Sequence, residues 1–169
     1  MLRAQCGDRE ALELLLTAVR PSLERYVQGL VGPSDAEDVL QDVLLIVYRK
    51  LTLLQQPEVF RAWMFRVASR AVFRYLKKRN RWPDRARDED AFEHLAAPDP
   101  PPRDEALLAL LASDVISPAS RAVLALHFQE ELSLPDVAAI LEIPLGTVKS
   151  RLSYGLSALR KHLTRERNM

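Results

Sequence analysis

Apolar residues recur at three- and four-residue steps along most of this chain, and that spacing is typical of α-helices with one buried face. In the N-terminal half the repeats are interrupted at VGPSD, at the polar loop TLLQQPEV and at Pro83. Ser34 precedes the second repeat as a helix cap, and Glu37 completes a capping box with it. The predicted helices are Asp8–Leu30, Ser34–Leu51 and Phe60–Trp82.

The C-terminal half has the same periodicity and its own start signals. Ser117 is predicted to cap one helix, and Ser133 with Asp136 forms a capping box for the next. Only residues 142–144 separate that helix from the last one. The last helix carries an apolar stripe that we expect to be buried: Leu145, Val148, Leu152, Leu156, Leu159 and Leu163. So short a turn indicates a helix-turn-helix, whose second helix enters the major groove; an αα-hairpin within a helical core is the alternative.

A stretch rich in proline and charge, PDRARDEDAFEHLAAPDPPPRDE, lies between the two halves and has the composition of a flexible linker. Aromatic residues and glycine are scarce, which favours an all-helical protein. We therefore predict an all-α fold of two small helical domains, residues 1–82 and 105–169, joined by a linker over residues 83–104.

Composition excludes several classes of protein. A single cysteine, Cys6, rules out an internal disulfide, and the three histidines lie too far apart in sequence to suggest a metal site, so we expect neither metal nor cofactor. No apolar run approaches the roughly 18 residues of a membrane span, and no signal-peptide pattern is present, so we expect a cytoplasmic protein. No nucleophile–base pair or glycine-rich phosphate loop indicates an enzyme.

The net charge of +1 conceals a segregation of charge into blocks. Between Tyr26 and Tyr48 every charged residue is acidic, whereas Arg61–Arg81 holds eight cations and no acid. Blocks of opposite sign favour several partners of different charge.

The second predicted helix places Asp38, Gln41, Asp42 and Leu45 together on a side away from its apolar stripe. An exposed leucine among carboxylates is typical of a protein interface, where the leucine gives affinity and the charges orient the partner. A solvated acidic face is the alternative.

The third predicted helix combines cations with aromatic rings on its outer face. Arg66, Arg70, Phe73, Arg74, Lys77 and Arg81 share that face, with Trp63 at its edge. Cations neutralise phosphates and a ring stacks on an unpaired base, so this face favours single-stranded or melting DNA over plain duplex; a merely solubilising face is the alternative. On the last helix, small polar and basic residues such as Lys149 and Ser153 lie opposite the apolar stripe.

These blocks, in this order, resemble the extracytoplasmic-function (ECF) group of bacterial RNA polymerase sigma factors. The similarity is carried by GDREALELL, SDAEDVLQDVLLIVYRKL, FRAWMFRVASRAVFRYLKKRNR, SPASRAVLALHFQEELSLPDVAAIL and IPLGTVKSRLS. It covers nearly the whole chain outside the linker. The stretches DAEDVLQ and PLGTVKSRL, in that order and at that separation, make it specific.

The resemblance implies a sigma region 2 domain followed by a region 4 domain. It implies that the clamp coiled coil of the polymerase's largest subunit is bound by Asp35, Asp38, Gln41, Asp42 and Leu45. The minus-ten promoter element would be opened and held by the loop Thr52–Val59 and by Trp63, Arg66, Arg70, Phe73, Arg74, Lys77, Lys78 and Arg81. The minus-thirty-five element would be contacted by Thr147, Lys149, Ser150, Arg151, Ser153, Tyr154 and Lys161. An anti-sigma factor would be a further partner.

Two departures from the family's usual residues bear on promoter preference. Arg70 stands where many relatives have asparagine, and Tyr154 stands where many have arginine. We therefore expect base preferences that differ from those of such relatives.

Two rival functions stay open. A sigma mimic that only displaces a sigma factor from its inhibitor would share the fold without needing the cations of the third helix. A stand-alone helix-turn-helix regulator would bind duplex operator as a dimer with two half-sites, but this chain shows no dimerisation heptads.

Overall fold

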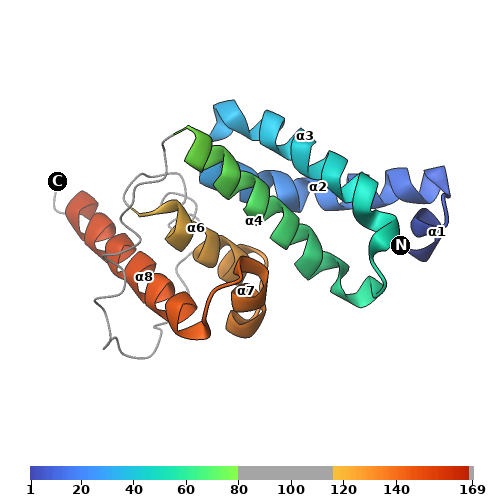
Figure 1. Ribbon diagram of the computed structural model, residues 1–169. Coiled ribbons are helices and arrows are strands. Elements are labelled where there is room, and N and C mark those ends of the chain that lie inside the picture. Colours follow the sequence, from blue (N-terminus) through green and yellow to red (C-terminus); the bar gives the residue numbers. More distant parts are fainter. Residues whose placement is uncertain (80–115, 168–169) are drawn as a thin grey trace. The chain divides into compact units, whose positions relative to one another are not determined.

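A computed structural model of the chain describes residues 1–79 and 116–167. Helices and turns make up this described part, which contains no strand, so the all-α prediction is confirmed. The chain divides into two compact units, Met1–Arg79 and Asn80–Met169 (Figure 1). The expected linker over 83–104 and the helix expected near Glu105 lie outside the described residues.

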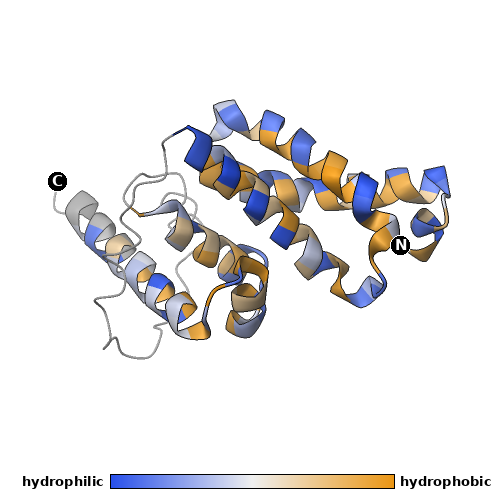
Figure 2. Ribbon diagram, viewed as in Figure 1, coloured by the Kyte–Doolittle hydropathy of each residue, from blue (hydrophilic) through white to orange (hydrophobic). Residues whose placement is uncertain are grey.

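Three long helices form the first unit: α2 (Arg9–Val31), α3 (Pro33–Lys50) and α4 (Phe60–Lys78). Each packs against the other two, and a short helix, α1 (Leu2–Gln5), packs against α2 (Figure 1). Two 3₁₀ turns, η1 (Leu51–Leu53) and η2 (Pro57–Val59), occupy the expected loop between α3 and α4. Figure 2 shows polar residues recurring between apolar ones along α4, as expected for a helix with one buried face.

Two details of the predicted helices in this unit are wrong. Ser34 is not a cap, because α3 already begins at Pro33 and its N-cap is Gly32, which has a φ of +88°. A proline at the first helical position and a glycine tolerant of positive φ start the helix instead of a side-chain hydrogen bond. The third predicted helix ends at Lys78 rather than Trp82.

The core of the first unit is centred on Tyr26 of α2, which is fully buried. Its ring meets Phe65 of α4 edge-to-face at 5.5 Å between centroids, and its hydroxyl lies 2.7 Å from Ser69 Oγ. The Ser69 hydroxyl donates to the carbonyl oxygen of Phe65 at 2.8 Å, so the Tyr26 hydroxyl donates to Ser69. These two hydrogen bonds satisfy both buried hydroxyl groups and link α2 to α4.

Tyr26→Phe should lower the free energy of unfolding by about 1 kcal/mol at neutral pH, because Ser69 loses its buried partner. Burial raises the pKa of the Tyr26 hydroxyl, and the Ser69 hydrogen bond offsets this only partly. The unfolded chain therefore releases this proton from about pH 10 upward while the folded chain keeps it, so rising pH destabilises the wild type through this group. Urea unfolding of both chains should show that the difference in their free energies of unfolding is smaller above pH 10 than at pH 7. A gap that is constant with pH would contradict this account.

The second unit contains α6 (Pro118–Leu124), the π-helical turn η4 (Ala125–Gln129), α7 (Leu134–Leu141) and α8 (Leu145–Arg167). Ser117 and Ser133 are caps, as predicted: their hydroxyls accept from the backbone amides of Ser120 and Asp136. The turn between α7 and α8 opens with Glu142 in the left-handed region, at a φ of +58°. The helix-turn-helix is therefore present, with α8 packed on both α6 and α7.

The apolar stripe of α8 agrees with the prediction except at its first residue. Val148, Leu152 and Leu156 are buried, whereas Leu145 at the start of the helix is 38% exposed. The side chains of Leu159 and Leu163 lie outside the described residues.

Gly155 of α8 lies against Leu124 of α6. A Cβ atom at this position would lie 2.7 Å from Leu124 Cδ1 and 3.3 Å from Leu124 Cγ. Because Leu124 is fully buried, a methyl group would have to displace core atoms. Close packing of the two helices thus explains a glycine inside the last helix.

Gly155→Ala is expected to lower the free energy of unfolding by about 1 kcal/mol, because overpacking outweighs the better helix propensity of alanine. Gly146→Ala is the matched control in the same helix, since nothing lies within 4 Å of a Cβ there. That change should raise stability by about 0.5 kcal/mol. Thermal unfolding of the two variants measures the difference, and equal shifts would show that Gly155 is not a packing residue.

Candidate nucleic-acid and protein interfaces

The outer face of α3 presents acidic and amide side chains around one leucine. Asp38, Gln41, Asp42 and Leu45 are all exposed, and Leu45 is 45% exposed. Gln41 donates a hydrogen bond of 3.1 Å to Glu37, which also receives Arg20 from α2. These contacts, Gln41 first, hold the pKa of Glu37 below its ordinary value. Glu37 therefore stays anionic at neutral pH and holds the Gln41 amide in place.

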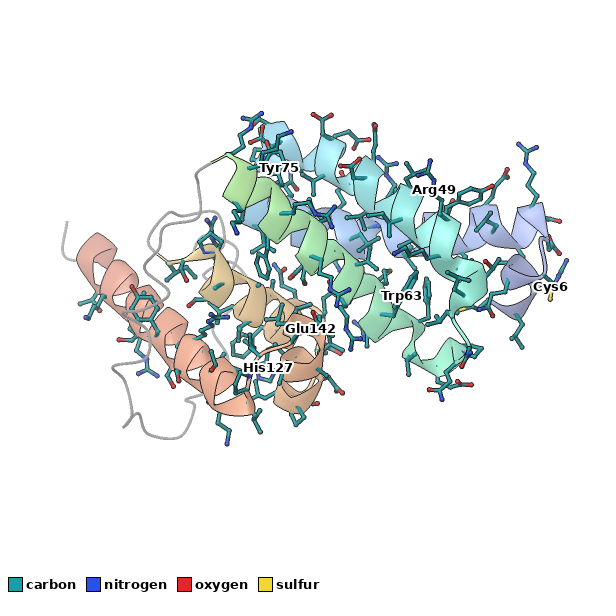
Figure 3. All side chains as sticks on the ribbon, in the orientation of Figure 1. Cys6, Arg49, Trp63, Tyr75, His127 and Glu142 are labelled. Carbon is teal, nitrogen blue, oxygen red and sulfur yellow. The ribbon has the colours of Figure 1, made fainter. Side chains whose placement is uncertain are left out.

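Asp35 lies apart from this face. Its side chain is only 12% exposed and pairs with Arg79, the residue after α4, at 3.7 Å. The Arg79 guanidinium also lies 5.3 Å from the centre of the Tyr75 ring (Figure 3 labels Tyr75). Asp35 thus joins the start of α3 to the end of α4, while the other four residues of the predicted set lie free of that contact.

The outer face of α4 carries the predicted cations. Arg70, Arg74, Lys77 and Lys78 are exposed, and Arg66 and Phe73 are half-buried. Trp63, near the start of α4 (Figure 3), is half-buried beside Phe60 at 6.0 Å between ring centroids. Arg81 lies outside the described residues. The exposed members form a basic surface over the last three turns of the helix, which suits a polyanion.

An open groove of about 380 Å³ runs between the acidic face of α3 and the basic face of α4. Its lining combines Asp42 and Leu45 of α3 with Arg74 and Lys78 of α4. The lining also includes Val39, Ile46, Arg49, Ala71 and Tyr75, none of which was predicted as a site residue. Helical periodicity predicts which residues share a face of one helix, but only the packing of α3 against α4 shows that these two faces adjoin.

The loop between α3 and α4 exposes apolar side chains. Leu53 in η1 is 73% exposed and Val59 at the end of η2 is 41% exposed, whereas Leu51 is buried and anchors the loop. The loop therefore leaves two apolar side chains accessible to another molecule.

The outer face of α8 holds the residues predicted for duplex DNA. Lys149 and Lys161 are exposed, and the other five are half-buried: Thr147, Ser150, Arg151, Ser153 and Tyr154. The Ser150 hydroxyl donates to the carbonyl oxygen of Gly146 at 2.9 Å, which fixes its orientation while its lone pairs stay available. All seven residues lie within the first five turns of α8, the helix that follows the helix-turn-helix turn.

The described residues contain no group of three or more histidine, cysteine or carboxylate side chains arranged to hold a metal ion. Among the same residues, no helix has both the length and the apolar character that a membrane span requires.

Comparison with known proteins gives the family. The profile for Sigma-70 region 2 matches residues 15–82, and that for Sigma-70, region 4 matches residues 114–161. The chain is 28% identical to the ECF RNA polymerase sigma-E factor of Escherichia coli K12, over 93% of this chain and 88% of that protein. It is 27% identical to the ECF RNA polymerase sigma factor SigW of Bacillus subtilis, over 93% and 91% of the two chains.

Solved structures share the fold. The sigma factor RpoE of Bartonella quintana, solved with the anti-sigma factor NepR, aligns with a TM-score of 0.69 at 24% identity, over 92% of this chain and 98% of that one. CnrH in complex with the cytosolic domain of CnrY aligns with a TM-score of 0.66 at 23% identity, over 97% and 94%. The region 2 and region 4 matches, together with the similarity to the two ECF sigma factors, mean that the chain belongs to the sigma-70 family of RNA polymerase sigma factors, in its ECF group.

Proposed function

We propose that this sigma factor divides its contacts by charge: α3 binds core RNA polymerase, α4 with the preceding loop holds the opened minus-ten element, and α8 reads the minus-thirty-five element. The observation that carries the proposal is the adjacency of an acidic face with an exposed leucine and a basic face in one compact unit. Surfaces of opposite charge on adjacent helices fit a protein and a nucleic acid held side by side.

On α3, Leu45 would supply the desolvated apolar contact to the polymerase, and Asp38 and Asp42 would orient it toward a basic partner surface. Gln41, held by Glu37, would add a hydrogen bond without having to be ordered first. Asp35 would support this surface from within, through Arg79, and contact the polymerase less directly than the other four.

On α4, the cations Arg70, Arg74, Lys77 and Lys78 would hold the phosphates of the separated strand. Trp63 and Phe73, half-exposed beside them, would offer rings for unstacked bases. Unstacking costs a few kcal/mol per site, and trapping the released bases would offset it.

On α8, Lys149 and Lys161 would contact backbone phosphates, while Ser150, Ser153 and Tyr154 would lie toward base edges. Each domain alone would bind weakly. Polymerase holds both on one promoter, so the first contact raises the effective concentration of the second.

The protein would act in the cytoplasm, where polymerase and promoters are, without catalytic activity of its own. An anti-sigma factor would be a further partner, as the anti-sigma factor NepR is for the sigma factor RpoE in one of the two related complexes. It would cover the same polymerase- and DNA-binding faces.

A binding experiment separates this proposal from its rivals. Labelled chain is mixed with core polymerase, with promoter-containing duplex, or with both. We expect a complex with polymerase, no tight binding to duplex alone, and a ternary complex when both are present. Tight duplex binding by a dimer without polymerase would instead identify a stand-alone regulator, and a polymerase complex that never engages DNA would identify a sigma mimic.

A further inference from the structure

The side chain of Gln5, at the end of α1, crosses to the loop between α3 and α4. Its amide nitrogen lies 3.0 Å from the carbonyl oxygen of Leu51 and 2.6 Å from that of Leu54, and it donates to both. A carboxamide NH₂ group has two hydrogens, so both are used. The next residue, Cys6, projects from the end of α1 (Figure 3).

These two carbonyl groups bracket the η1 turn. The amide of Leu54 closes the same turn by donating to the carbonyl oxygen of Leu51 at 3.2 Å. Leu53 sits between the two anchor points and is 73% exposed. Gln5 therefore fixes the backbone on both sides of a largely exposed apolar side chain, which lowers the entropy lost when that side chain meets a ligand.

The residues that follow α1 fix its position. Gly7, at a φ of +89°, turns the chain between α1 and α2. Asp8 caps α2 by accepting from the Ala11 amide at 3.0 Å and pairs with Arg3 of α1 at 2.7 Å. These bonds, the Ala11 amide first, hold the pKa of Asp8 below its ordinary value, so the link persists at neutral pH.

We propose that Gln5 is a positioning residue for promoter recognition: it holds the Leu51–Leu54 turn so that Leu53 is presented to an unpaired base of the minus-ten element. The inference rests on the proposed function of the loop and adds a role for α1, whose residues lie outside the region 2 match. Gln5 acts through the loop and does not touch DNA.

Gln5→Glu tests this role, because a carboxylate of the same shape accepts hydrogen bonds and repels the two carbonyl groups. Gln28→Glu, on the exposed side of α2, is the matched control with the same change of charge. Gln5→Lys is a rescue variant, since its ammonium group donates to both carbonyls. Transcription initiation by core polymerase with each variant is measured on a set of promoters that differ at single minus-ten positions. Amide hydrogen exchange of Leu54 is followed in the free chain.

For Gln5→Glu we expect unchanged polymerase binding, about tenfold faster exchange at Leu54, and about tenfold weaker discrimination among minus-ten bases. Gln28→Glu should match the wild type, and Gln5→Lys should recover part of the discrimination. Wild-type exchange at Leu54 in Gln5→Glu would overturn the inference, as would wild-type discrimination. Failure of the wild-type protein to initiate at any promoter would overturn the proposed function itself, which is a separate outcome.

Discussion

Promoter opening should fall at least about a hundredfold when Arg74 and Lys77 are both changed to glutamate, while polymerase binding persists. Both side chains are exposed on the basic face of α4. The double change replaces two cations with two anions, so contacts with phosphate become repulsive where the strands separate. Permanganate reactivity of unpaired thymines in the minus-ten region measures opening directly.

The matched control for that variant is Arg25→Glu with Lys50→Glu, which alters the net charge equally at exposed positions on α2 and α3 outside the basic face. We expect it to open promoters normally. Undiminished opening by the α4 variant would refute the assignment of this face to DNA. Raising the salt concentration should weaken DNA binding by the wild type more than DNA binding by the α4 variant, because the variant releases fewer counterions when it binds.

Affinity for core polymerase should fall about a hundredfold when Asp42 is changed to lysine and Leu45 to serine. Leu45 is the exposed apolar residue of the acidic face, and Asp42 lies beside it in the same groove. Losing a central apolar contact and reversing a neighbouring charge removes both affinity and orientation. Competition against a labelled sigma factor for core polymerase measures the loss.

Leu14→Ser with Glu24→Lys provides the comparison, because Leu14 is 65% exposed on α2 and Glu24 is exposed on the same helix. This variant makes the same leucine-to-serine change and the same reversal of charge away from the acidic face, and it should bind polymerase as the wild type does. If both variants lost affinity equally, α3 would not be the specific contact.

Local signals in the sequence predicted much of the fold. Caps at Ser117 and Ser133 each depend on residues within one turn, and the three-residue connection at 142–144 follows from the same stretch. Such features depend on neighbouring residues, so they can be predicted without knowledge of the tertiary structure. At Ser34 the same reasoning failed, because Pro33 and Gly32 started the helix one residue earlier.

Contacts between distant segments could not be predicted in this way. Gln5 and the carbonyl groups it binds are more than 45 residues apart, and no periodicity links them. The same holds for Asp35 with Arg79 and for Leu124 with Gly155, where packing decides what each residue does. The faces of α3 and α4 were each predicted from helical spacing, but their shared groove depends on how the helices pack.

Sequencing the 5′ ends of RNA made by core polymerase on genomic DNA fragments, with and without this protein, tests the central claim most directly. Added protein should produce transcripts that begin at a limited set of sites, each preceded by two shared upstream elements. RNA whose start sites are the same with and without the protein would contradict the claim that this chain directs polymerase to promoters.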